Sequence, residues 1–435
     1  MVAAILAGGR GARLGKLTLK TPKPLLELAG KTIIERQILF LKRNGFKKIW
    51  MLSGYLGDQI EKNIGYGEKY GLKINHIIEK SPLGTAGTLK NLESLIRGDF
   101  LIISGDLALD IDLKSLISFH KKMGGVATIV SHPSDHPLDS DLINVDKHDK
   151  VSYFNLRKTK VQPKNLIYRN LTCASVFVFS VQIFKFIKKF EISDIEKDLF
   201  PKIIKSRSAI YAYKTAEYIK DVGTKKRLGE ANKDILSGKV ERLNKKFKRP
   251  AIFLDRDGVI NKEVDELTSI GDLKLIPYSA QAIRRINNTD YLVIVITNQA
   301  SIAKGFITDE YLRTIHNKLE TLLGRQHAKL DAIYYCPHHP KKGFKGEISS
   351  LKKRCLCRKP QAGMIKKAVK EFNIDLKKSY FIGDSTIDVQ TAKNAGIKFI
   401  GVSTGYGVRD NKYKISNRVN VKKNLFEAVS TILHT

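Results

Sequence analysis

The chain has 435 residues, more than one hydrophobic core usually supports, so we expect two domains of ordinary size. Hydrophobic residues make up 42% of it, enough for two cores, and no apolar run approaches the roughly 20 residues of a membrane-spanning helix. The net charge of +34 invites a nucleic-acid-binding function, but the lysines and arginines are scattered in short groups. This pattern favours lysine-rich solvated surfaces, which would also attract small polyanions.

The first half of the chain alternates short apolar strands with amphipathic helices. We expect strands over 2–6, 48–52, 74–78, 100–104, 126–131 and 174–180, and a helix over 32–44. This β-α-β rhythm predicts a doubly wound α/β domain, with a mostly parallel sheet whose ligands bind at the carboxyl ends of the strands. The apolar start is too short for the core of a signal peptide, so we expect a cytoplasmic protein.

A glycine-rich loop follows the first strand, in the sequence Leu6-Ala7-Gly8-Gly9-Arg10-Gly11-Ala12-Arg13. Backbone N–H groups of such a loop can approach phosphate oxygens, and a helix that begins there adds a favourable dipole. The loop has neither the spacing of a Walker A motif nor that of a dinucleotide-binding fingerprint. By itself it is a weak signal for a nucleotide site.

Four further motifs follow this loop. They are Pro22-Lys23-Pro24-Leu25, Leu83-Gly84-Thr85-Ala86-Gly87-Thr88, Gly105-Asp106 and Asp221-Val222-Gly223-Thr224. Each residue alone could have a structural role, such as capping a helix or starting a turn. Together and in this order the motifs resemble the sugar-phosphate nucleotidyltransferases, which join a nucleoside triphosphate to a sugar 1-phosphate.

The resemblance implies roles for these residues. Arg13 would bind the departing pyrophosphate and Lys23 the phosphates near the reacting centre, where negative charge develops. Asp106 and Asp221 would hold Mg²⁺, which prefers carboxylate oxygens and water. The nucleotide would lie against Gly8, Gly9, Gly84, Thr85 and Ala86, with Glu79 as a further candidate in the same pocket.

The sugar end of this site departs from the family pattern. Ala12 replaces a Thr or Ser, Arg157-Lys158 replaces a Glu-Lys pair, and Cys173-Ala174-Ser175 replaces Asn-Ala-Gly. Lys158 remains a candidate ligand of the sugar phosphate, but the acidic partner of the sugar hydroxyls is absent or supplied elsewhere. Resemblance to mannose-type guanylyltransferases favours GTP as the donor. A nucleotide-sensing domain without catalysis is the alternative.

A second domain is expected beyond a polar linker. The composition changes after residue 231, and the charged segment 236–249 ends at Pro250, which divides a domain over 1–235 from one over 250–435. Strands are then expected over 251–254, 291–297, 379–383 and 398–402. The second domain is therefore predicted to be another doubly wound α/β unit, with too little chain after its first strand for a large cap.

Asp255-Arg256-Asp257-Gly258 follows the first strand of this domain. Two carboxylates one residue apart cannot share a face of a strand, so the turn must bring both to one site, one as nucleophile and one as acid or base. The motif resembles that of the haloacid dehalogenase (HAD) superfamily of phosphatases. Its other motifs follow in order: Thr297-Asn298, Arg358-Lys359 and Gly383-Asp384-Ser385 with Asp388.

This resemblance implies an aspartyl-phosphate mechanism. Asp255 would attack phosphorus, while Asp257 would protonate the leaving alcohol and later activate water. Thr297 and Lys359 would bind phosphate oxygens, and Asn298 would position the loop. The ligands of Mg²⁺ would come from Asp255, Asp257, Asp384 and Asp388.

Three of the four cysteines lie close together with two histidines, in Cys336-Pro337-His338-His339-Pro340 and Cys355-Leu356-Cys357. Three sulfurs and one imidazole satisfy tetrahedral Zn²⁺ with no open position, which indicates a structural site within 336–357; reduced buried cysteines are the alternative. Resemblance to the HAD subgroup of heptose-bisphosphate and histidinol-phosphate phosphatases selects His338 over His339, which would face the substrate or support the site. Cys173, in an apolar run, is expected in the core.

Within this subgroup, 253–261, 297–305, the metal loop and Arg358-Lys359-Pro360 resemble the D-glycero-D-manno-heptose 1,7-bisphosphate phosphatases most closely. The metal loop would position Arg358 to read a second anionic group. The two halves together predict a bifunctional enzyme of activated-heptose synthesis for lipopolysaccharide or another cell-surface glycan, without nucleic-acid or membrane partners. The alternatives are a phosphatase for histidinol phosphate or another sugar phosphate, joined to a hexose 1-phosphate nucleotidyltransferase, and a nucleic-acid-binding protein suggested by charge.

Overall fold

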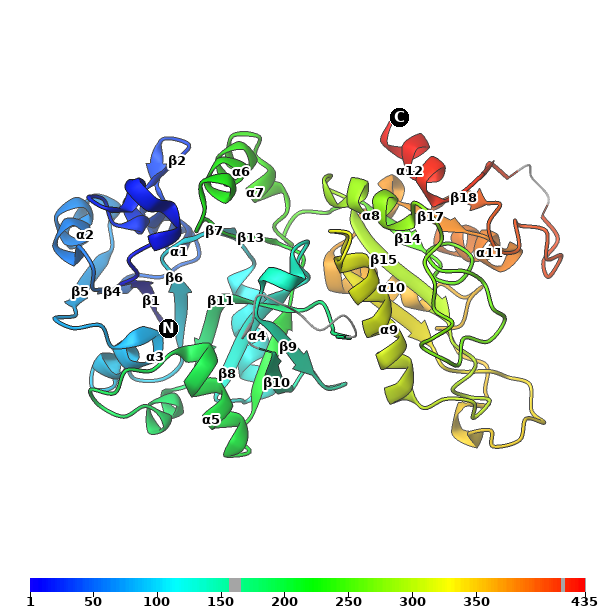
Figure 1. Cartoon of the computed structure of the whole chain (residues 1–435), viewed down its shortest axis with the longest axis horizontal. Helices are drawn as coiled ribbons and strands as arrows, with labels where there is room; N and C mark the ends of the chain where they lie inside the picture. The colour runs from blue at the N-terminus through cyan, green and yellow to red at the C-terminus, as the bar shows by residue number, and fades with distance from the viewer. Residues whose placement is uncertain (156–165, 416–418, 435) are drawn as a thin grey trace. The chain divides into compact units, whose positions relative to one another are not determined.

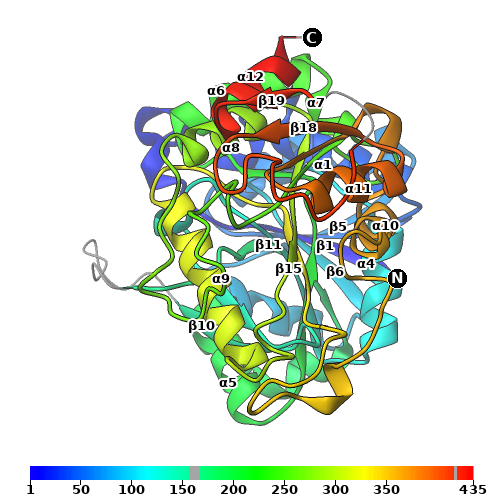
Figure 2. The same ribbon diagram turned by 90° about the vertical axis from the view of Figure 1, so that its right-hand side faces the viewer.

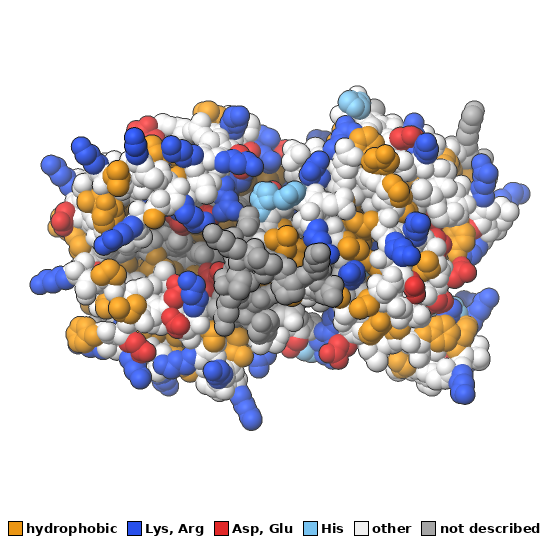
Figure 3. All heavy atoms as spheres, in the orientation of Figure 1, with side chains coloured by type: hydrophobic (Ala, Val, Ile, Leu, Met, Phe, Trp, Pro, Cys, Tyr) orange, Lys and Arg blue, Asp and Glu red, His pale blue; other side chains and the backbone are white. Residues whose placement is uncertain are grey.

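The computed structural model describes residues 1–155, 166–415 and 419–434, which form two compact units (Figure 1). The first unit comprises Met1–His132, the described part of 141–158, and Thr172–Asn244. The second comprises the chain from Lys245 onward, together with Pro133–Ser140 and the described part of 159–171. Among the described helices, none is long and apolar enough to cross a membrane. On the face drawn in Figure 3, lysines and arginines are spread over the surface without forming one stripe.

The first unit is built on a nine-stranded mixed sheet. Its parallel centre has the order β6 (Phe100–Ser104), β1 (Val2–Ala7), β4 (Lys48–Ser53) and β5 (Lys73–Ile78). β11 (Thr172–Phe179) pairs antiparallel with β6, and β8 (Ala127–His132), β9 (Leu142–Val145), β10 (Val151–Asn155) and β12 (Ile210–Lys214) complete the sheet. These strands confirm the predicted α/β fold.

Helix α1 (Ile33–Arg43) shows how local sequence positions the first site. The side chain of Thr32 caps the helix by accepting a hydrogen bond from the N–H of Glu35. Ile34, Ile38 and Leu41 recur at helical spacing and are buried in the core. Gln37, on the same buried side, donates hydrogen bonds of 2.9 Å to the carbonyl oxygens of Ser104 and Leu107. These two bonds bracket the turn that carries Asp106.

The remaining elements of this unit cover the sheet and extend it. The helices are α2 (Gly57–Ile64), α3 (Gly84–Gly87), α4 (Leu113–Met123), α5 (Phe200–Lys205), α6 (Lys225–Leu236) and α7 (Lys239–Arg242). Two small antiparallel sheets pair β7 (Leu107–Asp110) with β13 (Tyr218–Asp221) and β2 (Glu27–Leu28) with β3 (Lys31–Thr32). Helix α7 lies in the segment expected to be a linker, and Leu243 after it is buried beside Val222 and Ala231. Part of that segment therefore packs on the first unit.

The second unit contains a six-stranded parallel sheet in the order β16-β15-β14-β17-β18-β19. The strands are β14 (Ala251–Leu254), β15 (Leu292–Asn298), β16 (Ala332–Cys336), β17 (Tyr380–Gly383), β18 (Lys398–Val402) and β19 (Val421–Lys422). Right-handed crossovers place α8 (Ser279–Asn287) and α9 (Asp309–Gly324) on one face, with α12 (Leu425–Leu433), and α10 (Gly363–Phe372) and α11 (Thr386–Ala395) on the other (Figure 2). This is the doubly wound arrangement that the sequence predicted.

Two stretches from the first half of the sequence belong to this second unit. The backbone N–H of Tyr168 donates to the hydroxyl of Thr321 on α9 at 3.0 Å, and the hydroxyl donates back to the carbonyl of Tyr168 at 3.1 Å. The N–H of Asn170 donates to the carboxylate of Glu320 at 2.9 Å. Side chains of α9 thus satisfy backbone groups of a segment that lies far away in the sequence.

Candidate active sites

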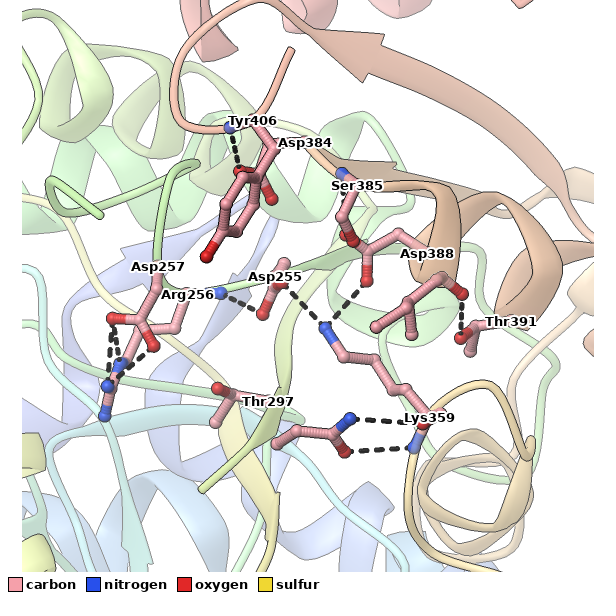
Figure 4. A network of polar contacts seen from close by, with 12 residues as sticks. Asp255, Arg256, Asp257, Thr297, Lys359, Asp384, Ser385, Asp388, Thr391 and Tyr406 are labelled. Carbon is pink, nitrogen blue, oxygen red and sulfur yellow. Dashed lines mark hydrogen bonds and ion pairs between the residues drawn. The ribbon is translucent and has the colours of Figure 1, made fainter. Parts of the chain in front are cut away.

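The four HAD-type motifs meet at one edge of the second sheet. Asp255 follows β14, Thr297 lies near the end of β15, and Asp384 follows β17, because parallel strands bring their carboxyl ends to the same edge (Figure 4). Lys359 reaches this edge from the loop before α10. The four residues line a pocket of about 220 Å³.

The centre of the pocket is a buried ion cluster. The Nζ of Lys359 lies 2.7 Å from a carboxylate oxygen of Asp255 and 2.7 Å from one of Asp388. Burial opposes the protonation of Lys359, but these two carboxylates outweigh it and raise its pKa. Burial raises the pKa of Asp255 well above its usual range, against the pull of Lys359, and raises the pKa of Asp384 to about 7. With all three acids ionised, the cluster would hold more buried negative charge than one lysine can offset.

Three of the predicted magnesium ligands come together here. Ligand oxygens of Asp255, Asp384 and Asp388 lie within 4.8 Å of one another. Three carboxylates beside one ammonium fit a hard divalent cation, which binds oxygen ligands and would neutralise the excess charge. Asp257 lies outside this group, and its carboxylate turns to the guanidinium of Arg256 instead (Figure 4).

Backbone geometry next to the cluster depends on a glycine. Gly258 has φ +74°, and a Cβ at this position would overlap the carboxylate of Asp384. That carboxylate also accepts a hydrogen bond of 2.8 Å from the N–H of Tyr406. Asp388 accepts bonds from the N–H and the hydroxyl of Ser385, at 3.2 and 2.7 Å. Each acidic side chain is therefore fixed by neighbouring donors.

Asn298 joins the end of β15 to Lys359. Its amide nitrogen donates to the carbonyl of Lys359 at 3.1 Å, and its amide oxygen accepts from the N–H of Lys359 at 3.0 Å. Thr297 is buried, and its hydroxyl accepts from the amide of Gln299 at 2.9 Å. Asn298 thus ties the end of β15 to the loop of Lys359, and its positioning role stays a prediction.

The predicted zinc ligands are gathered beside this pocket. The Sγ atoms of Cys336, Cys355 and Cys357 lie 3.2–3.5 Å apart, and Nδ1 of His338 is 3.2 Å from the sulfur of Cys357. Tetrahedral ligands at about 2.3 Å from Zn²⁺ would lie nearly 4 Å apart, so these atoms would have to spread by only about half an ångström to surround one ion. All four cysteines of the chain are free of disulfides. The donor set fits a closed metal site.

The loop around these cysteines also contributes to the pocket. Nη1 of Arg358 donates to the carbonyl of His338 at 3.0 Å, and both Arg358 and His339 line the pocket. His339, the histidine that was not selected as a ligand, has its Nδ1 3.2 Å from the carbonyl of Lys341. The cysteine loop thus carries a cation and an imidazole to the pocket wall.

Several pocket residues were not predicted from the sequence. They are Glu263, Asp265, Glu266, Lys304, Tyr406 and Lys412, all on loops around the edge of the sheet. No motif marks these positions, since their place depends on how the loops close over the strands. Gln299 was also missed, although it directly follows Thr297-Asn298 and donates to the carboxylate of Asp257 at 3.2 Å.

In the first unit, the structure brings together the predicted cation and carboxylates. The buried Nζ of Lys23 contacts the carboxylate of Asp106 and lies 3.4 Å from that of Asp221. Arg13 lies 3.9 Å from Asp221, and Arg227, which was not predicted, lies 2.5 Å from it. Burial raises the pKa of Asp221, but these three cations outweigh it and the net shift is downward. Asp221 is thus held as a carboxylate.

Gly223 permits the close packing of Asp221 and Arg13 in the first site. A Cβ there would lie 2.6 Å from a carboxylate oxygen of Asp221 and 2.7 Å from the guanidinium of Arg13. The N–H of Gly223 itself donates to Asp221 at 2.7 Å. In the described ranges no third histidine, cysteine or acid joins Asp106 and Asp221 in a metal-binding group. A cation held here would draw its other ligands from phosphate and water.

The other predicted nucleotide-binding residues lie on the loop after β1 and on α3, which follows β5 in the chain. Gly8 and Gly9 follow β1, and the carbonyl of Gly8 accepts a hydrogen bond of 3.4 Å from the N–H of Tyr55. The hydroxyl of Thr85 donates to Asp194 at 3.0 Å. The N–H of Ala86 donates to the carbonyl of Ser193 at 2.8 Å. Thus α3, which begins at Gly84, is tied to the segment that precedes α5.

At the sugar end, Lys158 and its neighbour Arg157 lie outside the described residues. Cys173, expected in the core, is only half-buried and lies beside the carboxylate of Glu196. Ser175 donates to that carboxylate at 3.2 Å. Burial raises the pKa of Glu196 to about 7, and the hydrogen bonds from Cys173 and Ser175 only partly oppose it. Sequence reasoning missed Glu196, which precedes α5 without any motif to mark it.

Comparison with known proteins agrees with this picture. The family model for nucleotidyl transferases matches residues 2–238, and the HAD-hydrolase-like model matches residues 356–425. The D-glycero-D-manno-heptose-1,7-bisphosphate 7-phosphatase of Thermosynechococcus vestitus is 38% identical over 164 residues, which are 37% of this chain and 82% of that protein. The D-glycero-beta-D-manno-heptose-1,7-bisphosphate 7-phosphatase of Rhodopseudomonas palustris is 39% identical over 150 residues, 34% of this chain and 81% of that protein.

Two solved structures are also similar. HddC from Yersinia pseudotuberculosis, complexed with GMP-PN, has 23% identity and a TM-score of 0.47, covering 54% of this chain and 99% of HddC. The D,D-heptose 1,7-bisphosphate phosphatase from B. bronchiseptica, complexed with magnesium and phosphate, has 32% identity and a TM-score of 0.38, covering 42% of this chain and 98% of that one.

Fold and sites define an enzyme with two catalytic domains, a nucleotidyltransferase followed by a HAD-type phosphatase. The chain belongs to the nucleotidyl transferase family through residues 2–238, and through its second domain to the family of the D-glycero-D-manno-heptose-1,7-bisphosphate 7-phosphatases.

Proposed function

We propose that the chain is a bifunctional enzyme of nucleotide-activated heptose synthesis. The second domain removes the 7-phosphate of D-glycero-D-manno-heptose 1,7-bisphosphate. The first domain then transfers a nucleotidyl group to the heptose 1-phosphate and releases pyrophosphate. The observation that carries this proposal is the shared pocket, in which the aspartate cluster faces Arg358 on the cysteine loop. The names of the similar phosphatases support the same substrate.

In the phosphatase reaction, a carboxylate oxygen of Asp255 attacks phosphorus and the bond to the sugar oxygen breaks. Asp257 donates a proton to that oxygen, so the sugar leaves as an alcohol. Asp257, now a carboxylate, takes a proton from water, whose oxygen attacks the aspartyl phosphate and frees Asp255 and inorganic phosphate. Lys359 and Thr297 hold phosphate oxygens and offset their charge. Mg²⁺, bound by Asp255, Asp384 and Asp388, would supply further positive charge to this site.

The cysteine loop determines which phosphate ester is accepted. Zn²⁺ held by Cys336, His338, Cys355 and Cys357 would fix the loop, and the bond from Arg358 to the carbonyl of His338 would then fix the guanidinium. The guanidinium would bind the phosphate that stays on the sugar. Thiols that serve as metal ligands suit a reducing compartment, so we place the protein in the cytoplasm.

In the nucleotidyltransferase reaction, the sugar phosphate attacks the α-phosphorus of the triphosphate and pyrophosphate leaves. Lys23, Arg13 and Arg227 lie around Asp221 and would stabilise the charge that develops on the phosphates. Asp106 and Asp221 would bind Mg²⁺ together with the phosphates. GTP as the donor rests on the resemblance of the sequence to guanylyltransferases.

The sugar end of the first site is where this chain is unusual. Lys158 would bind the sugar phosphate. Glu196, brought next to Cys173 and Ser175, is our candidate for the acidic partner of the sugar hydroxyls that the sequence did not reveal.

A coupled assay with heptose 1,7-bisphosphate, GTP and Mg²⁺ tests both halves, with phosphate and pyrophosphate measured separately. Asp255→Asn should abolish phosphate release from the bisphosphate, and Lys23→Met should abolish pyrophosphate release while phosphate release continues. Asp255→Asn should regain pyrophosphate release when heptose 1-phosphate is supplied. Failure of the folded wild-type protein to release either product would refute the proposal. Binding of GTP without pyrophosphate release would indicate a sensing domain instead.

A further inference from the structure

Arg256, the residue between the two aspartates of the motif, is the largest fully buried side chain of the described structure, with no exposed surface. It does not reach the pocket. Its Nη2 lies 2.9 and 2.8 Å from the two carboxylate oxygens of Asp257, and its Nε lies 3.1 Å from the first of them. The guanidinium therefore approaches the carboxylate edge-on, in the geometry that fixes the plane of both groups.

Two amides complete the surroundings of this carboxylate. Asn261 donates to one oxygen of Asp257 at 2.8 Å, and Gln299 donates to the other at 3.2 Å. The side chain of Asp257 keeps 20% of its surface exposed, where it lines the pocket. Arg256 thus packs behind a carboxyl group whose other side faces the pocket.

The remaining nitrogen of the guanidinium has its own partner. Nη1 of Arg256 lies 3.3 Å from Nε2 of His316, a buried residue on α9. Burial and the charge of Arg256 lower the pKa of His316 well below its usual value, so the imidazole is neutral. With the proton on Nδ1, its Nε2 accepts the hydrogen bond. The ring also packs against Tyr335 of β16, at 5.6 Å between centroids.

We propose that Arg256 is a positioning residue that aims the carboxyl group of Asp257 at the leaving oxygen, and that His316 holds Arg256 in this orientation. This rests on the proposed role of Asp257 as the general acid. Proton transfer requires the carboxyl oxygen to lie within hydrogen-bond reach of the leaving oxygen, and displacement by about 1 Å can lower a rate about 100-fold. Helix α9 therefore contributes to catalysis through His316, without touching the substrate.

The dependence on the leaving group tests this role in the full-length protein. Release of a sugar alkoxide needs a proton from Asp257, whereas 4-nitrophenolate leaves without one. In His316→Phe, where Nη1 of Arg256 loses its acceptor, kcat/KM for heptose 1,7-bisphosphate should fall about 10-fold to 100-fold. The kcat/KM for 4-nitrophenyl phosphate should change less than about 3-fold, because this constant reports only steps up to release of the phenol. His316→Gln, whose amide oxygen can accept the same bond, should restore the wild-type ratio.

The ratio of the two constants separates positioning from a packing role. Equal losses with both substrates, or an unchanged ratio in His316→Phe, would overturn the proposal. If His316→Phe does not fold, Arg256→Lys serves instead, because lysine keeps the charge but not the two parallel bonds. Its kcat/KM should again fall more for heptose 1,7-bisphosphate than for 4-nitrophenyl phosphate. Equal losses of kcat/KM with both substrates would refute the proposal. If the wild-type protein does not hydrolyse the heptose bisphosphate, the proposed substrate fails, and the comparison is made with the hexose phosphate that it hydrolyses fastest.

Discussion

Replacement of Glu196 by glutamine should stabilise the first domain while it weakens sugar binding. Burial raises the pKa of this carboxyl from 4.5 to about 7, which corresponds to a preference of about 3 kcal/mol for its neutral form. Because the side chain is only partly buried, we discount this value for solvent screening to about 1–2 kcal/mol. Glutamine is neutral at every pH and still accepts the bond from Ser175.

The pH dependence has a definite sign. A folded-state pKa above the unfolded one favours folding below pH 4.5, and this contribution is lost as the pH rises towards 7. The advantage of Glu196→Gln should therefore grow from about pH 4.5 to pH 7 and stay constant above it. At pH 8 the thermal midpoint of the first domain should rise by about 2–8 °C.

The chain offers a direct probe for this measurement. Its single tryptophan, Trp50, is buried in β4 of the first unit, so tryptophan fluorescence reports the unfolding of that unit. Glu191→Gln, at an exposed position nearby, is the matched control and should have no effect. The KM for heptose 1-phosphate should rise about 10-fold in Glu196→Gln, with the KM for GTP unchanged, because a hydrogen bond to a charged acceptor is lost. Equal stability of the wild type and Glu196→Gln at pH 8 would refute the reasoning. The same difference in stability between them at pH 5 and at pH 8 would also refute it.

Three further predictions concern the second domain. Cys357→Ser, or removal of zinc by a strong chelator, should lower the thermal midpoint of this domain and its phosphate release, while pyrophosphate release persists. Bound zinc is measured by atomic absorption. A variant that keeps stoichiometric zinc would contradict the assignment of Cys357 as a ligand. Gly258→Ala should lower phosphate release at least about 100-fold, because the new Cβ overlaps the carboxylate of Asp384. Gly271→Ala is the control and should leave phosphate release nearly unchanged, because only a serine hydroxyl lies near its new Cβ, at 3.4 Å. Arg358→Met should raise the KM for the bisphosphate about 10-fold or more and that for a monophosphate little, and equal increases would argue against recognition of a second phosphate.

The sequence by itself determined the α/β fold of both domains and the two classes of reaction, nucleotidyl transfer and phosphate-ester hydrolysis. Strand positions could be predicted because alternating apolar strands and amphipathic helices report burial locally, and the predicted strands of the first half each begin within two residues of an observed one. β9, β10 and β12 of the same sheet were not predicted. Asp255, Asp384 and Asp106 could be anticipated at these centres because each lies in a short motif just after a strand, and parallel strands bring such ends together. Lys359 and Lys23 also lie in motifs, but segments away from the strand ends carry them to the aspartates.

Only the tertiary structure decided which residues support these centres. Arg256 stands in the most recognisable motif of the chain, yet its partner His316 comes from a helix that no motif links to it. Glu196 reaches Ser175 from a segment without a pattern, and the backbone around Tyr168 is satisfied by Thr321, about 150 residues away in the sequence. Such contacts depend on the packing of whole elements, whose side chains are free to vary so long as volume and hydrogen bonds are satisfied. Periodicity and short motifs carry no trace of them, which is why the sequence indicated the two classes of reaction, whereas only the fold shows which side chains contact Arg256 and Ser175.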